Sequence, residues 1–450
     1  MRQPPSHDPI RRALVRAAAA LAAAESFQLP AWSAKDPTVL PPSIGAKRDQ
    51  IVLPLYCMGS AVITAPRPTH ETRSRKGAAC SQAPVRPRSQ FCTEYYIDGR
   101  RFRAVVDTGS PFMLVDGSVT ASNERWGRFP VDDSPLSVPL DDVSYEMFGG
   151  QDVDVEWRRG SLRLAGYSNL LQQNAWLGDR LQGARSGPWT SPSPMDVMYE
   201  PMNFGVVRTY QGRGGGGAIY LGLAKDRQPS RIRPTFLEQT DLSSMRFDFL
   251  GRTLTLARRP LLNTRTDAIP LVDLRPLGAP LASYAVKAHR LLANGQELDL
   301  KRPVYAIIDT GTTGLVIGDT LYDSDEFPLP GAAVRKMEVE VLTEAGKVVT
   351  LSAGRRRRRL DEVGLQAGLT TLASASSAGG PAQSPLQPSP FAESFPLITT
   401  PVKLDWFAKK KLPPGEEAPH VICLGLAFLS RLQLTIDADE MRMATKVLDV

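Results

Sequence analysis

The chain has 450 residues, 42% hydrophobic and 22% charged, which is enough for two domains with substantial cores. The net charge of +7 falls to +2 (7 − 5) without the arginines at 355–359, so composition gives no support for a nucleic-acid-binding protein. Its 38 Pro and 36 Gly interrupt short alternating apolar runs, which favours an all-β protein.

The N-terminal region has the character of a targeting segment. In residues 1–33, arginines precede an Ala/Leu run at 17–24, as in a secretory signal or an organelle transit peptide. We therefore expect the secretory or endomembrane pathway, with a plastid or another organelle as the alternative. No apolar run approaches the ~18 residues that a membrane-spanning helix needs. We expect no stable membrane span.

Residues 34–90 are rich in Pro and basic residues and contain one apolar run, 51–55. This pattern fits a propeptide-like region, and it fits an edge strand followed by a linker equally well. Of the cysteines, Cys80 and Cys92 are candidates for a pair, whereas Cys423 lies in an apolar run and is expected in the core.

One short signature occurs twice. Asp107–Ser110 reads Asp-Thr-Gly-Ser and follows the apolar run 104–106, and Asp309–Thr312 reads Asp-Thr-Gly-Thr and follows 306–308. A carboxylate at the end of a buried strand is costly unless it is hydrogen-bonded or used in chemistry. Two such carboxylates in matching contexts predict two halves of one site.

The repetition continues downstream of each signature. Gly222 in Ile-Tyr-Leu-Gly-Leu lies 115 positions (222 − 107) after the first aspartate, and Gly425 in Ile-Cys-Leu-Gly-Leu lies 116 positions (425 − 309) after the second. Alternating apolar residues around a polar turn then predict hairpins at 247–256 and 434–443. A period this long indicates duplication of a whole lobe.

These motifs resemble those of the pepsin-like aspartic proteases. The stretches FCTEYYIDGRRFRAVVDTGSPFMLVDGS, VYAIIDTGTTGLVIGDTLY and ICLGLAFLSRLQLTIDADEMRMATK carry the resemblance, which covers 91–450. It implies an all-β bilobal fold with a cleft between an N-terminal lobe at 91–265 and a C-terminal lobe at 266–450. Residues 354–395 interrupt the second lobe, and their Arg, Ala, Ser, Gly and Pro content predicts a disordered insertion.

The resemblance also implies a division of roles within the site. Asp107 and Asp309 would be the catalytic pair, sharing one proton and activating a water between them, by the logic known from pepsin. Thr108 and Thr310 would bond across the lobe junction. The other supporting residues would be Gly109, Ser110, Gly311 and Thr312.

A hairpin flap over the cleft is a further feature implied by the resemblance. Gly160 and Ser161 match its Gly-Ser, which puts Trp157 in place of the usual Tyr. An ordinary core aromatic is the equal alternative for Trp157. The chain also departs from the family pattern at Pro111 and Leu426.

The expected function is that of a monomeric aspartic endopeptidase acting on a peptide or protein, made as a zymogen and needing no cofactor or metal. Lys47 is the candidate shield of the carboxylates in the zymogen, and the arginines at 355–359 are a candidate processing site. A catalytically inactive pepsin-fold binder or inhibitor is the alternative. The histidines show no zinc-ligand or serine-hydrolase spacing and are expected at the surface; they are His7, His70, His289 and His420.

Overall fold

The structure is a computed structural model whose described residues all fall in one compact unit, Pro41–Val450. The described residues are 49–59, 89–117, 126–131, 137–148, 151–166, 196–211, 219–225, 233–262, 267–279, 283–327, 334–354, 399–402 and 418–448. The predictions for the targeting segment, Lys47, Cys80, and the insertion beyond Gly354 therefore lie outside the described residues.

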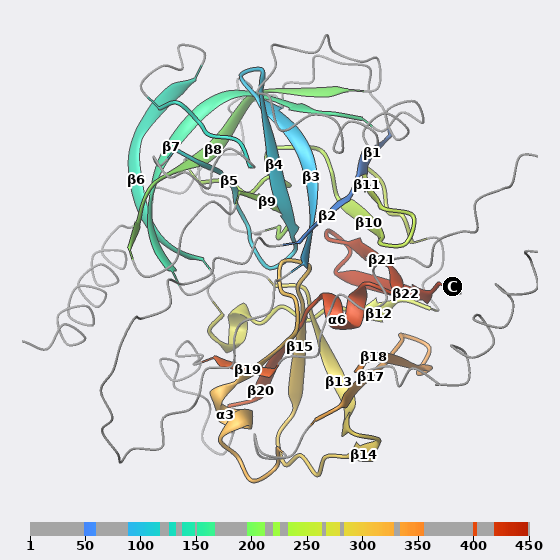
Figure 1. Ribbon diagram of the computed structural model, residues 1–450. Coiled ribbons are helices and arrows are strands. Elements are labelled where there is room, and N and C mark those ends of the chain that lie inside the picture. Colours follow the sequence, from blue (N-terminus) through green and yellow to red (C-terminus); the bar gives the residue numbers. More distant parts are fainter. Residues whose placement is uncertain are drawn as a thin grey trace, which may run out of the picture. The chain divides into compact units, whose positions relative to one another are not determined.

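The described chain is mostly strand with very little helix, so the all-β prediction is confirmed. Its strands form three sheets (Figure 1). The first, here the N-terminal sheet, has the order β2-β3-β4-β9-β5-β8-β7-β6. Its strands are β2 (Tyr56–Gly59), β3 (Ser89–Ile97), β4 (Arg100–Asp107), β5 (Met113–Asp116), β6 (Val138–Phe148), β7 (Gln151–Leu164), β8 (Val197–Gln211) and β9 (Tyr220–Gly222).

The N-terminal sheet closes on itself. An additional antiparallel pairing between β3 and β7, in which Tyr95 lies opposite Leu164, joins strands far apart in the sheet order and gives a barrel-like sheet. Within this barrel-like sheet, β4 runs parallel to β9, with Asp107 beside Gly222. The first aspartate therefore stands at the end of a buried strand.

The C-terminal sheet has the order β18-β17-β13-β15-β20-β16-β19, with β14 paired to β13. Here β15 runs parallel to β20, with Ile308 beside Leu424, and β20 is antiparallel to β16. The N-terminal sheet has the same arrangement in β4, β9 and β5. The strands are β13 (Ala285–Ala293), β14 (Gln296–Glu297), β15 (Val304–Ile308), β16 (Leu315–Gly318), β17 (Lys336–Leu342), β18 (Val348–Gly354), β19 (Thr399–Val402) and β20 (His420–Leu424).

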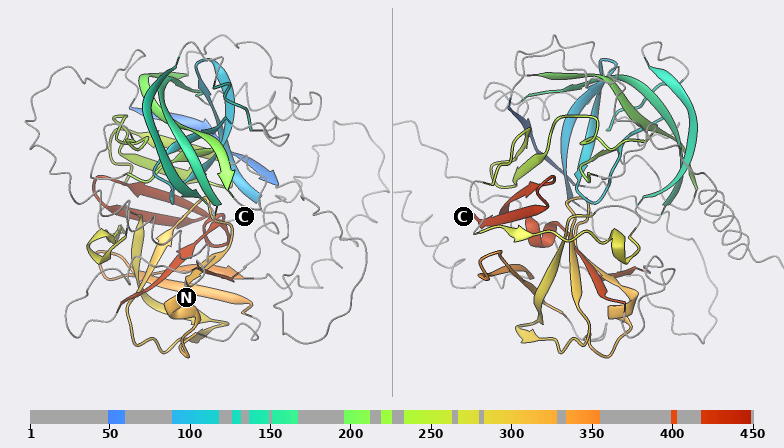
Figure 2. Two further views of the ribbon diagram at one scale, coloured as in Figure 1. Left: turned by 90° about the vertical axis from the view of Figure 1, so that its left-hand side faces the viewer. Right: turned by 180° about the vertical axis from the view of Figure 1, so that it is seen from behind.

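The third sheet combines strands from both halves of the chain and is called the joint sheet. Its order is β1-β11-β10-β21-β22-β12. Figures 1 and 2 show green β10 and β11 beside red β21 and β22. Its strands are β1 (Gln50–Pro54), β10 (Ser244–Asp248), β11 (Thr253–Ala257), β12 (Ile269–Pro270), β21 (Leu432–Asp437) and β22 (Arg442–Val447).

Both predicted hairpins are present in the joint sheet, and they pair with each other. Phe247 of β10 lies opposite Leu434 of β21, and both side chains are fully buried. The apolar run at 51–55 supplies β1, which is one of the two edge strands of this sheet. The two repeated hairpins therefore lie in one sheet.

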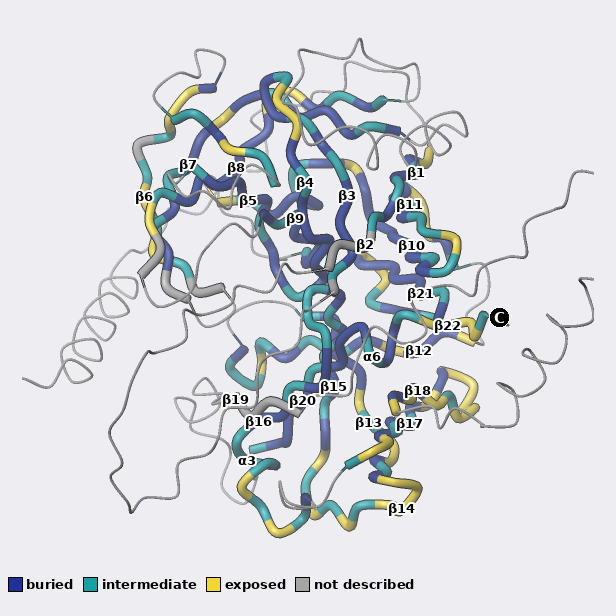
Figure 3. Tube along the Cα trace, viewed as in Figure 1, coloured by how far each residue is buried: buried dark blue, intermediate teal, exposed yellow. Residues whose placement is uncertain are grey.

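A single apolar cluster runs through the three sheets. It contains Val106 from β4, Ile308 from β15 and Ile436 from β21, each 0% exposed. In Figure 3 the last residues of β4 are dark blue, and β15 alternates dark blue with teal up to its end at Ile308. The strand ends that carry the two aspartates are therefore embedded in one continuous core.

A buried carboxylate ties the joint sheet to the connection between the two halves. Asp437 is 1% exposed and accepts hydrogen bonds from the backbone N–H of Leu261 (3.0 Å) and Leu262 (3.3 Å). It also accepts the hydroxyl of Ser244 on the neighbouring strand. A carboxylate this buried is stable only because it is hydrogen-bonded.

We predict that Asp437→Ala lowers the free energy of unfolding by about 3 kcal/mol, because it leaves buried donors without an acceptor. Chemical denaturation measures the change. Asp439→Ala is the matched control: this aspartate is 56% exposed, beside Lys225, and its loss should change stability by less than about 1 kcal/mol. Equal effects of the two substitutions would contradict the anchoring role of Asp437.

Candidate active site

The two repeated loops meet face to face, and their glycines are where they come closest. A Cβ built on Gly109 would lie 2.8 Å from Cγ of Asp309, and one built on Gly311 would lie even closer to Cγ of Asp107. Each glycine therefore packs against the aspartate of the opposite loop. Only a residue without a side chain permits this approach.

Two threonines join the loops through reciprocal hydrogen bonds. The hydroxyl of Thr108 donates to the carbonyl of Ile308 (2.7 Å), and the hydroxyl of Thr310 donates to the carbonyl of Val106 (2.7 Å). Each hydroxyl oxygen also accepts the backbone N–H of the other threonine at 3.1 Å. Both threonines are 0% exposed, so this network is shielded from water.

The carboxyl groups of Asp107 and Asp309 are neighbours, because each lies against the glycine of the opposite loop. Asp107 is 6% exposed, and burial raises the pKa of its carboxyl well above the usual range. The negative charge of Asp309 and the hydrogen bond to it raise that pKa further, against the opposing effect of Ser110 and Gly109. The site therefore favours the protonated form of Asp107.

Each carboxyl group is also oriented by its own loop. Asp107 accepts the N–H of Gly109 (2.8 Å) and the hydroxyl of Ser110 (2.5 Å). Asp309 accepts the N–H of Gly311 (2.8 Å) and the hydroxyl of Thr312 (2.6 Å). The structure thus brings together the predicted pair and all six predicted supporting residues.

One contact with the pair was not expected from the sequence. The Sγ of Cys423 lies 3.4 Å from Oδ2 of Asp309 and donates to it. Cys423 was expected in the core; it is half-buried in β20, opposite Ile307 and Val316. Its position two residues before Gly425 is the only sequence signal that could have linked it to the site.

The predicted flap residues are not brought to the aspartates. Gly160 and Ser161 lie inside β7, and the N–H of Ser161 donates to Asp98 (3.0 Å), which precedes β4, whereas Asp107 ends β4. The last pair of the β6–β7 ladder is instead Phe148 opposite Gln151. The match of two residues, Gly-Ser, was too short to locate the turn.

Trp157 occupies the core, as in the alternative interpretation. It is 0% exposed, and its indole N–H donates to the hydroxyl of Ser144 at 2.8 Å. Its ring meets Phe112 edge-on, with centroids 5.1 Å apart. Trp157 therefore contacts the first loop only through apolar packing.

The surface expectation is wrong for His420. The side chain is 0% exposed, with Nε2 3.4 Å from Glu326 and Nδ1 3.2 Å from the hydroxyl of Thr320. Burial of an imidazole requires such partners, because a buried polar group without a hydrogen bond is costly. The sequence around His420 contains no signal for these partners, which come from residues about a hundred positions earlier.

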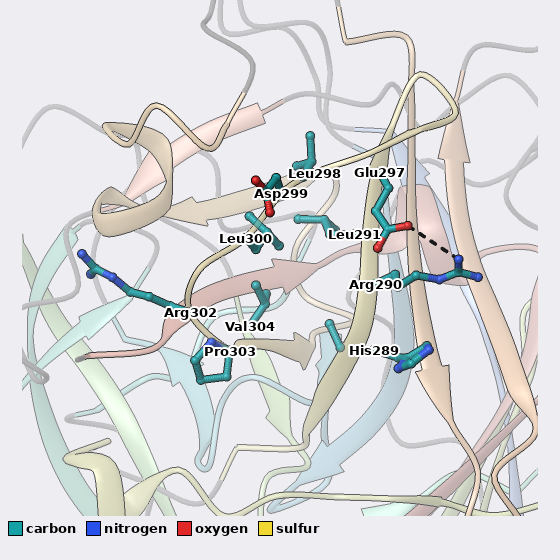
Figure 4. Close-up of a pocket in the computed structure, with 11 residues that line it drawn as sticks. His289, Arg290, Leu291, Glu297, Leu298, Asp299, Leu300, Arg302, Pro303 and Val304 are labelled. Atoms are coloured by element: carbon teal, nitrogen blue, oxygen red, sulfur yellow. Dashed lines mark ion pairs between the residues drawn. The ribbon is translucent and has the colours of Figure 1, made fainter. Parts of the chain in front are cut away.

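A hollow of about 450 Å³ lies elsewhere in the second half of the chain (Figure 4). It is lined by β13, β14 and the segment that leads into β15, and Arg290 pairs with Glu297 (3.6 Å) at its rim. Neither aspartate lines it. The chemistry of the pair and this hollow are therefore separate features.

Within the residues described, no group of three or more His, Cys, Asp or Glu side chains is placed to hold a metal ion. The described helices are also too short or too polar to cross a membrane. No protein-family model matches the sequence, and no curated protein sequence matches it. The residues of the site are therefore the basis for a functional assignment.

We predict that Thr108→Val lowers the free energy of unfolding by about 2 kcal/mol, because the carbonyl of Ile308 and the N–H of Thr310 lose a buried partner. Valine keeps the shape of threonine, so packing is preserved. Thr108→Ser, which retains the hydroxyl, is the control and should lose less. Chemical denaturation of the three proteins tests this, and equal losses would refute it.

The raised pKa of Asp107 predicts a pH-dependent stability difference from Asp107→Asn. The folded wild type holds this proton more tightly than the unfolded chain, so stability is lost as pH rises from the unfolded pKa through the folded one. The variant lacks this group. Wild type should therefore lose up to about 1.4 kcal/mol per pH unit relative to Asp107→Asn in that interval.

Denaturation curves at a series of pH values measure this difference. Asp439→Asn, which replaces an exposed carboxylate, is the control. Its stability should follow the wild-type curve across the same pH values. A difference between wild type and Asp107→Asn that is constant across pH would rule out the raised pKa.

Proposed function

We propose that this protein is an aspartic endopeptidase with a bilobal pepsin-like fold, in which the N-terminal and C-terminal sheets belong to two related lobes. The observation that carries the proposal is that Asp107 and Asp309 stand in two topologically equivalent loops, each packed against the glycine of the opposite loop and joined by the threonine hydrogen bonds. The substrate would be an extended peptide lying across the junction of the lobes. One chain supplies both aspartates, so a monomer suffices.

The chemistry follows from one proton shared by two carboxyl groups. Two carboxylates in contact and largely out of water do not both ionise, so one stays protonated. The ionised group would take a proton from a water molecule as that water attacks the peptide carbonyl carbon. The protonated group would donate to the carbonyl oxygen, and a proton would then pass to the departing nitrogen as the C–N bond breaks.

The surrounding contacts support this role. The hydrogen bonds from Ser110 and Thr312 hold the carboxyl groups in fixed orientations, and the threonine network holds the loops together. Preorganised groups of this kind need no rearrangement during the reaction, which is a large part of how enzymes lower barriers. No cofactor is required for this reaction.

Precursor processing and location are part of the proposal. We keep residues 34–90 as a propeptide-like region and the secretory or endomembrane pathway as the compartment, with a plastid or another organelle as the alternative. Leu53 of β1 is 0% exposed and β1 pairs along β11. A cut between β1 and β3 would leave β1 bound to the joint sheet through these contacts.

Digestion of a mixed peptide library at acidic and neutral pH tests the function. Asp107→Asn and Asp309→Asn should each reduce cleavage by at least about 100-fold, because each removes one partner of the acid–base pair. Asp439→Asn replaces an exposed aspartate outside the two loops, and this variant should cleave peptides as the wild type does. Mass spectrometry of the products reports activity and specificity together.

Absence of cleavage by folded and processed wild type would overturn the enzyme assignment. It would leave the pepsin-fold binder or inhibitor as the function of the same scaffold. Cleavage that persists in both asparagine variants would instead show that another protein in the preparation is responsible.

A further inference from the structure

The two halves of the site differ at the position two residues before the repeated glycine. Cys423 lies two residues before Gly425, and its thiol contacts Asp309 at 3.4 Å. In the first half the matching residue is Tyr220, two before Gly222, in a strand that runs parallel to β4. The thiol is therefore present in the second half of the site and has no counterpart at the matching position of the first half.

The second aspartate receives the larger set of donors. Oδ1 of Asp309 accepts the N–H of Gly311 (2.8 Å) and of Thr312 (3.2 Å). Oδ2 accepts the Thr312 hydroxyl (2.6 Å) and the Cys423 thiol (3.4 Å). These are four hydrogen bonds from the described residues, and each favours a negative charge on this carboxyl.

The first aspartate receives fewer such donors. From its own loop Asp107 accepts one N–H, from Gly109, and one hydroxyl, from Ser110. Because donors stabilise a carboxylate more than a carboxylic acid, the electrostatic environment of the pair is unequal. In the half-ionised pair, the negative charge is favoured on the carboxyl that accepts more hydrogen bonds.

We propose that Cys423 is a positioning residue that directs the negative charge of the half-ionised pair to Asp309 and the shared proton to Asp107. This inference rests on the proposed function, since it assigns the general base to Asp309 and the general acid to Asp107. A thiol is a weak donor, but here it acts on a charged acceptor in a partly buried place.

The state of the thiol fits this role. Burial, together with the charge of Asp309, raises the pKa of the Cys423 thiol well above its usual value, so it stays protonated and remains a donor. A nucleophilic role would need the thiolate, which this site disfavours. In the described residues, the titratable groups of the site are the pair itself, Asp107 at the end of β4 and Asp309 directly after β15, and Cys423 on β20.

The pH profile of kcat/KM for Cys423→Ala tests the placement of the charge. If Asp309 ionises first, its donor acts on the first ionisation, and loss of the thiol should move the acidic limb up by about half a pH unit. The alkaline limb should stay in place, because Asp309 is ionised on both sides of it. A shifted alkaline limb with a fixed acidic limb would put the charge on Asp107 and overturn the proposal.

The pH profiles of two further variants test the same assignment. Cys423→Ser keeps a donor at the same position and should restore part of the wild-type acidic limb, which a purely structural role of the sulfur would not produce. Ser110→Ala removes a donor to the other aspartate and should move the alkaline limb instead. Unchanged profiles in all three variants would overturn the proposal.

A measurement without turnover separates this inference from the proposed function. The loss of stability caused by Cys423→Ala should shrink on acidification and should be smaller in an Asp309→Asn background, because the thiol then faces an uncharged partner. A loss that is equal in both backgrounds and independent of pH would assign Cys423 to packing alone. This result stands whether or not the protein cleaves peptides.

Discussion

The reciprocal hydrogen bonds between Thr108 and Thr310 are the contact on which the rest of the site depends. Each hydroxyl reaches across to a backbone carbonyl next to the opposite aspartate, at 2.7 Å, and accepts the opposing N–H. Because these groups are fully buried, breaking the network would leave several polar groups without partners. The two loops are therefore held at one separation, and the separation decides whether two carboxyl groups can share a proton.

The close approach has an electrostatic consequence. Gly109 and Gly311 let each loop pack against the other's aspartate, which places a buried acidic group, Asp107, next to a partly buried one, Asp309. Such a pair is stable only with a proton between its members and with donors around them. The strand ends supply the donors, and the continuous core below them, with the joint sheet anchored by Asp437, keeps the strand ends in place.

Some of this was accessible from the residues alone. The alternation in 247–256 and 434–443 correctly predicted two hairpins, because a half-buried strand has a period of two. The repeated Asp-Thr-Gly correctly predicted that Asp107 and Asp309 would meet, because both follow buried strands in matching contexts. The Gly-Ser at 160–161 failed to predict a turn, since β7 continues through it in a long ladder with β8.

The sequence by itself determined the strand-rich architecture, the duplication and the identity of the paired aspartates, since these depend on local patterns and on spacing along the chain. Only the tertiary structure decided what lies beside them. The contact of Cys423 with Asp309, separated by 114 positions, arises because parallel pairing of β15 with β20 sets distant residues side by side. The partners of buried His420, Thr320 and Glu326, come from the segment that follows β16. The physical reason is that register between strands is fixed by packing of the whole sheet, which no short segment encodes.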